Sequence, residues 1–340
     1  MRKLFFILLT FILFHRADAQ SQVVNRQQFF LDERVIDATL TTDIKKLRSD
    51  KKVPVYQPAN IVMRFSDTAT ISEEIRVETR GEFRKATCDI ASLMINFKNS
   101  SSPKLSPLKK LKLVGGCRST NTDEELLLKE YLIYKMYNVI TNMSFRVRLL
   151  HITYKDSKEK MKPYTQYAFL IEDLGDMAKR NNCIEIKKGK KYIQESTNRE
   201  QMTIVALFEY MIGNTDWSLP NDHNVKLMTP NNDTLAMPYV VPYDFDYTGV
   251  VNAPYAIPDE QFGNTTVVER VYRGGSRTLD ELMEAINIFK EKKERIMYYI
   301  DNFALLNPKT RKTVSTYIAE FYNTIENKNS IRSIFNPAKN

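Results

Sequence analysis

The spacing of hydrophobic residues changes along the chain and divides it into a strand-rich first half and a helix-rich second half. In the first half, apolar residues alternate with polar ones or form short runs, which predicts β-strands. The expected strands are 60–65, 74–79, 92–97, 108–114, 145–154 and 167–171. One helix interrupts them, because apolar residues recur at helical spacing over 126–140 after an expected N-cap at Asp123.

Helices dominate the second half. Residues 199–212 have one apolar face, and Thr278-Leu279-Asp280-Glu281 forms a capping box that predicts a helix to about Asn302. A further helix is expected over 308–325. Two short strands, 225–228 and 239–241, each lie beside a polar segment. This order predicts an α+β protein.

The N-terminus has the pattern of a secretory signal peptide. A basic start, an apolar run over 4–14 and Ala17-Asp18-Ala19 predict cleavage after Ala19. The apolar run is short for a bilayer span, which favours a signal peptide over the alternative of a membrane anchor. The mature chain is therefore expected to be secreted or periplasmic, with no transmembrane segment.

The net charge indicates which partners to expect, and the cysteines indicate a possible disulfide. Without residues 1–19, 47 basic residues stand against 40 acidic ones, a balance that fits acidic partners. The basic residues do not cluster with aromatic ones, so nucleic acid is not an expected partner, and the run 187–191 is interpreted as a solvated loop. Cys88 and Cys117 are expected to form a disulfide that leaves Cys183 free, with three buried thiols as the alternative.

Two polar segments carry the candidate chemistry. Asp216 follows the helix 199–212 and is a candidate base for an attacking hydroxyl, with a turn-capping role as the alternative. Asn224 is a candidate ligand of Mg²⁺ or Mn²⁺, and Asn221 is its rival. Asp244 is expected to be the principal metal ligand and Asp246 a secondary one. His223 is interpreted as structural. Such a set fits phosphoryl transfer from Mg-ATP.

Other charged residues are candidates for binding the nucleotide. Lys112 is expected to neutralise ATP phosphates and to pair with Glu130, which lies in an apolar stripe; Lys110 is the alternative, and exposure of both charges is a further one. Glu172 ends the strand 167–171, where a hinge beside the nucleotide is expected. Two basic loops are candidates for holding a phosphate or an acidic substrate, with an ordinary exposed loop as the alternative: Arg80-Gly81-Glu82-Phe83-Arg84, and the loop with Arg270, Arg273 and Arg277.

Several of these motifs, in this order, resemble the CotH-type (spore-coat protein H-like) atypical kinases. The resemblance spans about residues 58 to 250, and its most specific parts are Asn214-Thr215-Asp216 and Pro242-Tyr243-Asp244-Phe245-Asp246. It implies a bilobal protein-kinase-like fold, with an antiparallel N-lobe sheet and one helix over 58–172 and a helical C-lobe over 173–330. Residues 20–57 would form an extension and first strands, and 331–340 a frayed tail. The implied activity is transfer of the γ-phosphate of Mg-ATP to a protein Ser or Thr.

Three departures from the family pattern keep other functions open. Trp217 stands where the family has arginine, and the spacing from Asp216 to Asn224 is three residues longer than usual. Asp89-Ile90-Ala91 replaces a lysine-containing motif. The alternatives are a non-catalytic scaffold with a pseudokinase site, and a phosphotransferase for a small molecule.

Overall fold

The computed structural model describes residues 26–49, 55–81, 88, 92–118, 120–187, 189–233 and 235–336. The expected signal peptide lies outside these residues. The same holds for 82–87, which include most of the first basic loop, for 89–91, and for the end of the tail, 337–340.

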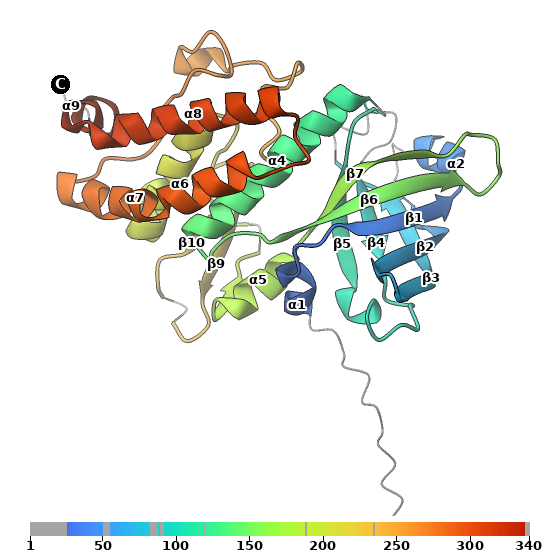
Figure 1. The fold of residues 1–340 in the computed structure, drawn as a ribbon. Helices are drawn as coiled ribbons and strands as arrows, with labels where there is room; N and C mark the ends of the chain where they lie inside the picture. The colour runs from blue at the N-terminus through green and yellow to red at the C-terminus, as the bar shows by residue number, and fades with distance from the viewer. Residues whose placement is uncertain are drawn as a thin grey trace, which may run out of the picture.

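The first half of the chain forms a closed barrel of seven strands (Figure 1). Their order around the barrel is β1-β2-β3-β4-β5-β7-β6, and β1 pairs in parallel with β6, with Ile36 opposite Leu150. The other neighbours are antiparallel. The strands are β1 (Ile36–Thr42), β2 (Gln57–Ser66), β3 (Ala69–Thr79), β4 (Leu93–Asn96), β5 (Lys110–Gly115), β6 (Val147–Asp156) and β7 (Tyr164–Ile171).

This barrel shows that the predicted fold class is wrong. A bilobal kinase-like fold with an open antiparallel N-lobe sheet was expected, whereas the sheet here is mixed and closed. The physical reason is β1, which forms backbone hydrogen bonds with β2 on one side and β6 on the other. Ile36, Ala38 and Leu40 alternate with half-buried residues, so one face of β1 completes the barrel core.

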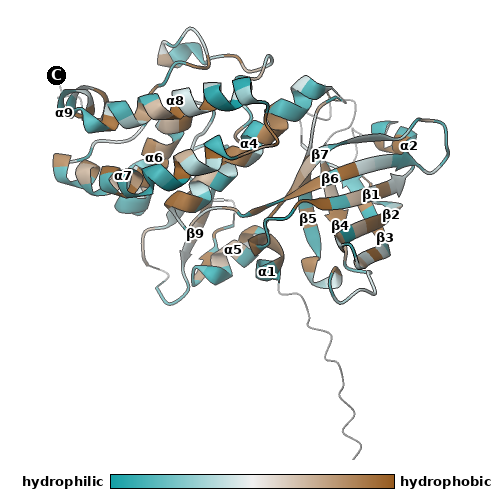
Figure 2. Ribbon diagram, viewed as in Figure 1, coloured by the Kyte–Doolittle hydropathy of each residue, from teal (hydrophilic) through white to brown (hydrophobic). Residues whose placement is uncertain are grey.

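The barrel interior is filled with apolar side chains from all seven strands. Fully buried residues such as Ile61, Ile95 and Leu150 belong to this cluster, and the strands alternate between apolar and polar residues (Figure 2). The strand β6 is buried on both faces, because Leu149 belongs to the core of the helical part while Leu150 lies in the barrel. The helical part therefore packs directly on the barrel wall.

The second half contains the long helices and a small sheet. The helices are α4 (Asn121–Ile140), α5 (Leu174–Arg180), α6 (Arg199–Ile212), α7 (Leu279–Asp301) and α8 (Pro308–Glu326). The sheet has the order β10-β9-β8, with β8 (Cys183–Glu185), β9 (Val225–Pro230) and β10 (Tyr239–Pro242). The predicted helix 199–212 and the capping box at Thr278 are confirmed. The N-cap of α4 is Thr120 rather than Asp123.

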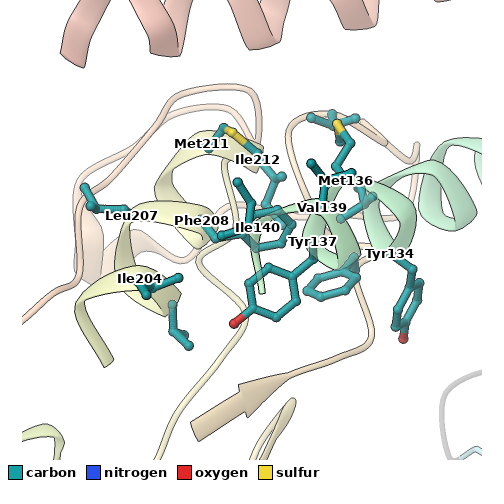
Figure 3. Packing of buried hydrophobic residues seen from close by; sticks show 14 of the residues in the cluster. Tyr134, Met136, Tyr137, Val139, Ile140, Ile204, Leu207, Phe208, Met211 and Ile212 are labelled. Atoms are coloured by element: carbon teal, nitrogen blue, oxygen red, sulfur yellow. The ribbon is translucent and has the colours of Figure 1, made fainter. Parts of the chain in front are cut away.

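Aromatic side chains join α4 to α6 in the core of the helical part. The rings of Tyr137 and Phe208 lie 4.3 Å apart between their centroids (Figure 3). The Tyr137 hydroxyl accepts a hydrogen bond from Gln201 Nε2 at 3.2 Å, so its polar end is satisfied inside the core. These contacts hold α6, whose C-terminal end at Gly213 leads into the candidate site, against α4.

Short elements complete the described chain. They are α1 (Arg26–Leu31), α2 (Ile44–Ser49), α9 (Lys328–Ser330), the 3₁₀-helices η1 (Ser106–Leu108), η2 (Gln194–Ser196) and η3 (Glu260–Phe262), and the π-helix η4 (Ile331–Phe335). The predicted disulfide between Cys88 and Cys117 is confirmed, and Cys183 is free and buried. Among the described helices, none combines the length and apolar character that a bilayer crossing requires.

Candidate functional site

A cavity of about 420 Å³ lies where the barrel meets the helical part. Four residues that the sequence singled out, Asp216, Asn224, Asp244 and Asp246, line it together. The barrel contributes Arg80, Gly81, Ser92 and Val114, and the remaining lining residues are His223 and Tyr247. Asn221, the rival of Asn224, is exposed and is not among the lining residues.

A tight loop brings Asp216 and Asn224 together. Helix α6 ends at Gly213, whose φ of 68° is in the left-handed region that glycine adopts without strain. Backbone hydrogen bonds of 2.9 Å in both directions between Ser218 and His223 then close the loop. Asn224 Nδ2 donates to the Asp216 backbone carbonyl at 2.8 Å and to Asp216 Oδ2 at 2.9 Å. The additional residues between Asp216 and Asn224, relative to the family pattern, lie in this loop.

The Asp216 carboxylate is held from two sides. While Asn224 binds Oδ2, the His223 Nε2 atom lies 2.7 Å from Oδ1. The Asp216 backbone N–H donates to Asn214 Oδ1 at 2.9 Å. Sequence reasoning treated His223 as structural, but the structure places it in the cavity wall with a direct bond to the candidate base.

Asp244 is placed by a strained backbone and a buried tyrosine. Its φ is 67°, an unusual value for a residue other than glycine, and Asp222 and Asn224 have φ values of 50° and 52°. Such conformations persist where surrounding contacts enforce them, often at functional sites. One contact is the Asp244 N–H, which donates to the Tyr134 hydroxyl at 2.9 Å. Asp246 accepts a hydrogen bond of 3.1 Å from the Tyr255 hydroxyl.

Positive side chains gather beside these carboxylates. Burial lowers the pKa of Lys112 to about 8, and repulsion by Arg80 and Lys226 contributes, while Asp244 and Asp173 oppose the shift. Lys112 Nζ and Lys226 Nζ each lie 5.2 Å from the centroid of the Tyr243 ring. Sequence reasoning missed Lys226, which lies on β9 two residues after Asn224.

The predicted pairing of Lys112 with Glu130 is not formed. Both residues belong to the described part of the chain, and the carboxylates that act on Lys112 are Asp244 and Asp173. Glu130 is only 1% exposed and lies in a smaller cavity with Gly116 and Asp246. The alternative lysine, Lys110, lies over the Tyr56 ring, at 5.0 Å from its centroid.

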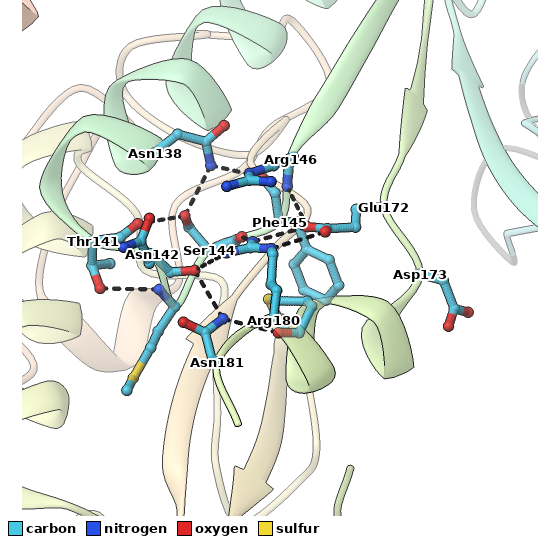
Figure 4. Close-up of polar contacts among 12 residues, drawn as sticks. Asn138, Thr141, Asn142, Ser144, Phe145, Arg146, Glu172, Asp173, Arg180 and Asn181 are labelled. Carbon is cyan, nitrogen blue, oxygen red and sulfur yellow. Dashed lines mark hydrogen bonds and ion pairs between the residues drawn. The ribbon is translucent and has the colours of Figure 1, made fainter. Parts of the chain in front are cut away.

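The Glu172 side chain is held by hydrogen bonds and an ion pair within the protein (Figure 4). Arg180 Nε and Nη2 donate to its two carboxylate oxygens, each at 2.9 Å, and the Arg146 backbone N–H donates to Oε2 at 3.0 Å. Arg180 also donates to the carbonyls of Asn142 and Ser144. The Glu172 side chain therefore ties β7 to α5, and Glu172 is not among the lining residues of the cavity that holds Asp216 and Asp244.

The three arginines of the second basic loop are bonded within the protein. Arg270 lies over the Tyr317 ring, and Arg277 donates to Thr203 Oγ1. Arg273 donates to the carbonyls of Thr215 and Trp217, both at 2.6 Å, and its guanidinium carbon lies 4.7 Å from the Trp217 ring centroid. Arg273 thus fixes the backbone on both sides of Asp216, a role that no feature of the sequence indicated.

A buried acid lies behind the same loop. Burial raises the pKa of Glu209 to about 8, Asp216 adds to the rise, and Asn214 and Arg273 oppose it. Its carboxyl oxygens are fully enclosed on the last turns of α6. Arg273 also interacts electrostatically with Asp259 and Asp216.

The oxygen ligands in the cavity suit a divalent cation that binds together with a nucleotide. Within the described ranges, no three Asp, Glu, His or Cys side chains are arranged as a metal site. Asp244, Asp246 and the Asn224 amide offer hard oxygen ligands in one cavity. Mg²⁺ is commonly bound through one or two carboxylates together with phosphate oxygens and water, so a preformed cage is not required.

Comparisons with known proteins assign no family to the chain: no family model matches it, and no curated protein matches it. Function has to be argued from the site, because similar folds host unrelated activities and similar chemistry recurs on different folds.

Proposed function

We propose that this protein is an exported kinase that transfers the γ-phosphate of Mg-ATP, or Mn-ATP, to the hydroxyl of a protein serine or threonine. One observation carries the proposal: Asp216, Asn224, Asp244 and Asp246 line a single cavity. Positive side chains lie beside them, since Arg80 lines the same cavity and acts on Lys112. A phosphate donor and its cation need both kinds of charge in one place.

In this proposal Asp216 accepts or orients the proton of the acceptor hydroxyl. Its carboxylate is suited to this role because His223 and Asn224 hold it in one orientation. Arg273 keeps the flanking backbone in position through the carbonyls of Thr215 and Trp217.

Asp244, with Asp246 and Asn224, would hold the divalent cation. When bound, that cation neutralises charge on the phosphates during transfer. Arg80, Lys112 and Lys226 are then the groups that attract the phosphates, because Arg80 lines the cavity and both Arg80 and Lys226 act electrostatically on Lys112. Membership of the CotH-type kinases is part of this proposal, supported by the ordered motifs around Asp216 and Asp244. The proposal rests on the site and not on a kinase-like fold.

A second candidate is a non-catalytic scaffold that binds a nucleotide. The observation that favours it is the missing pair between Lys112 and Glu130, because the carboxylates acting on Lys112 come from Asp244 and Asp173 instead. A scaffold would keep nucleotide binding and lack transfer, so the two candidates differ in a measurable way.

The test combines thermal stabilisation with labelled ATP. A ligand at a hundredfold excess over its Kd stabilises the folded state by about 2.7 kcal/mol, and Mg-ATP or Mn-ATP is expected to raise the melting temperature. Asp216→Asn should bind nucleotide and lose transfer to protein acceptors, whereas Asp244→Asn should lose the metal-dependent part of binding. Asp67→Asn, at the exposed turn between β2 and β3, is the control and should behave as wild type.

The possible outcomes separate the candidates. Binding without transfer by the wild type would support the scaffold. No stabilisation with either metal would overturn both. Equal transfer by wild type and Asp216→Asn would remove the assignment of the base.

A further inference from the structure

A second cavity, of about 290 Å³, lies beside the proposed site. Three lysines line it, Lys187, Lys190 and Lys226, together with Tyr192 and the carboxylates Asp222 and Glu185. The sequence suggested that the run 187–191 is a solvated loop. In the structure Lys187 and Lys190 are exposed, and both line a hollow that β9 also lines.

The two cavities share one wall. His223 and Asn224 line the cavity that holds Asp216, while Asp222 and Val225, directly on either side of them in the chain, line the lysine cavity together with Lys226. Consecutive Cα atoms are about 3.8 Å apart, so only a single segment of backbone separates the two hollows. Lys226 connects them electrostatically, because its charge also contributes to the lowered pKa of Lys112.

Two of the three lysines in this cavity leave their charge available to a ligand. Within the part of the chain that the structure describes, neither Lys187 nor Lys190 takes part in an ion pair. The carboxylates of Asp222 and Glu185 reduce the net charge of the wall but leave the lysines in excess. A modest excess of this kind suits a single carboxylate better than a long polyanion.

We infer that this lysine cavity binds an acidic side chain of the acceptor protein, a few residues from the hydroxyl that reaches Asp216. The inference rests on the proposed function, since it names the substrate class of the same site. An extended peptide advances about 3.3 Å per residue, so two or three residues span about 7 to 10 Å. A glutamate at that distance along the peptide can therefore reach across the segment 222–226, which lines both cavities. Tyr192 supplies an apolar contact for the peptide beside the charged groups.

The test measures peptide binding, which does not depend on catalysis. Fluorescent peptides carry one serine with glutamate two and three positions away on both sides, or glutamine at the same positions. Their Kd values for the mature protein are compared by fluorescence anisotropy. The glutamate peptide is expected to bind at least about fivefold more tightly, with the preference shrinking as salt rises, because exposed charges are screened. The double variant Lys187→Glu/Lys190→Glu should abolish the preference for the glutamate peptide.

A matched control changes the net charge equally. Lys155→Glu/Lys158→Glu alters two exposed lysines at the β6–β7 turn, at the far end of the barrel from the small sheet (Figure 1), and should keep the preference. If both double variants lose the preference equally, the effect is one of overall charge and the inference is overturned. An equal Kd for both peptides with the wild type overturns it as well.

Two further outcomes are informative. If Lys187→Glu/Lys190→Glu weakens stabilisation by Mg-ATP and leaves the peptide preference intact, the cavity serves the nucleotide and the inference fails. If the glutamate preference is lost in that variant but the wild type transfers no phosphate, the acidic-peptide site stands and the proposed kinase activity fails.

Discussion

The substitution Arg180→Ala gives a direct measure of how the region between the barrel and α5 is held. Arg180 and Glu172 form an ion pair of 2.9 Å whose side chains are only 6% and 1% exposed. After the substitution, Glu172 keeps the hydrogen bond from the Arg146 N–H and loses both bonds from the guanidinium. Its carboxylate then stays buried without its directly bonded counter-charge, while the Arg146 guanidinium still interacts with it electrostatically.

The expected loss of stability follows from the burial of Glu172. Removing one partner of a buried pair costs about 3–5 kcal/mol, because the remaining charge is desolvated without compensation. Unfolding entropy near 60 °C is about 2.1 cal/mol/K per residue, so for a mature chain of about 320 residues the loss corresponds to about 5–7 °C in Tm. An exposed pair contributes at most about 1 kcal/mol, or about 1 °C to 2 °C on the same scale.

The assay is differential scanning calorimetry of three variants at constant pH and salt. Arg199→Ala is the control, because its pair with Glu281 has side chains that are 47% and 32% exposed. Arg180→Ala should lower the Tm several times more than Arg199→Ala. Glu172→Gln/Arg180→Met, which removes both charges, should recover part of the loss. If the two single variants lose the same small amount, the pair is solvated and the structural role of Glu172 is refuted.

Three further predictions concern other parts of the molecule. The pKa of Lys112 lies near 8 instead of 10.5, so the affinity for Mg-ATP should fall by up to about tenfold per pH unit between pH 8 and 10.5. Between pH 8 and 10.5, Lys112 is neutral in the folded state and still protonated in the unfolded state, so the free energy of unfolding should rise with pH. Calorimetry should therefore show wild type gaining stability relative to Lys112→Met as the pH rises. The Cys88–Cys117 disulfide closes a loop with a sequence separation of 29, and replacing both cysteines by serine should cost about 3.6 kcal/mol in denaturant titrations. Gly213→Ala should lower the Tm, because a Cβ there would overlap Tyr317 Oη at a positive φ, and Tyr317→Phe should relieve part of that loss.

Local patterns in the sequence predicted local structure well. The helix 199–212 and the capping box at Thr278 are found where the spacing of residues placed them. The disulfide expected for an exported protein is also formed. The predicted pairing of Lys112 with Glu130 is wrong, because strand and helix periodicity give a side chain's face and not its partner. Barrel closure was missed for a related reason: residues 20–57 were expected to form only an extension and first strands, and nothing nearby in the sequence indicates that Ile36 lies opposite Leu150.

The closed barrel helps to fix the positions of the candidate site residues relative to one another. A sheet with open edges can move against a helical body, whereas β6 is buried on both faces between the barrel core and the helical core. On the neighbouring strand β7, the ring of Phe169 lies 5.6 Å from that of Tyr134, whose hydroxyl accepts the Asp244 N–H. The position of Asp244 thus depends on packing against the barrel wall, and Lys112 lies on β5, which pairs with β7. The candidate phosphate and metal groups therefore belong to one packed unit, which reduces the ordering that ligand binding would require.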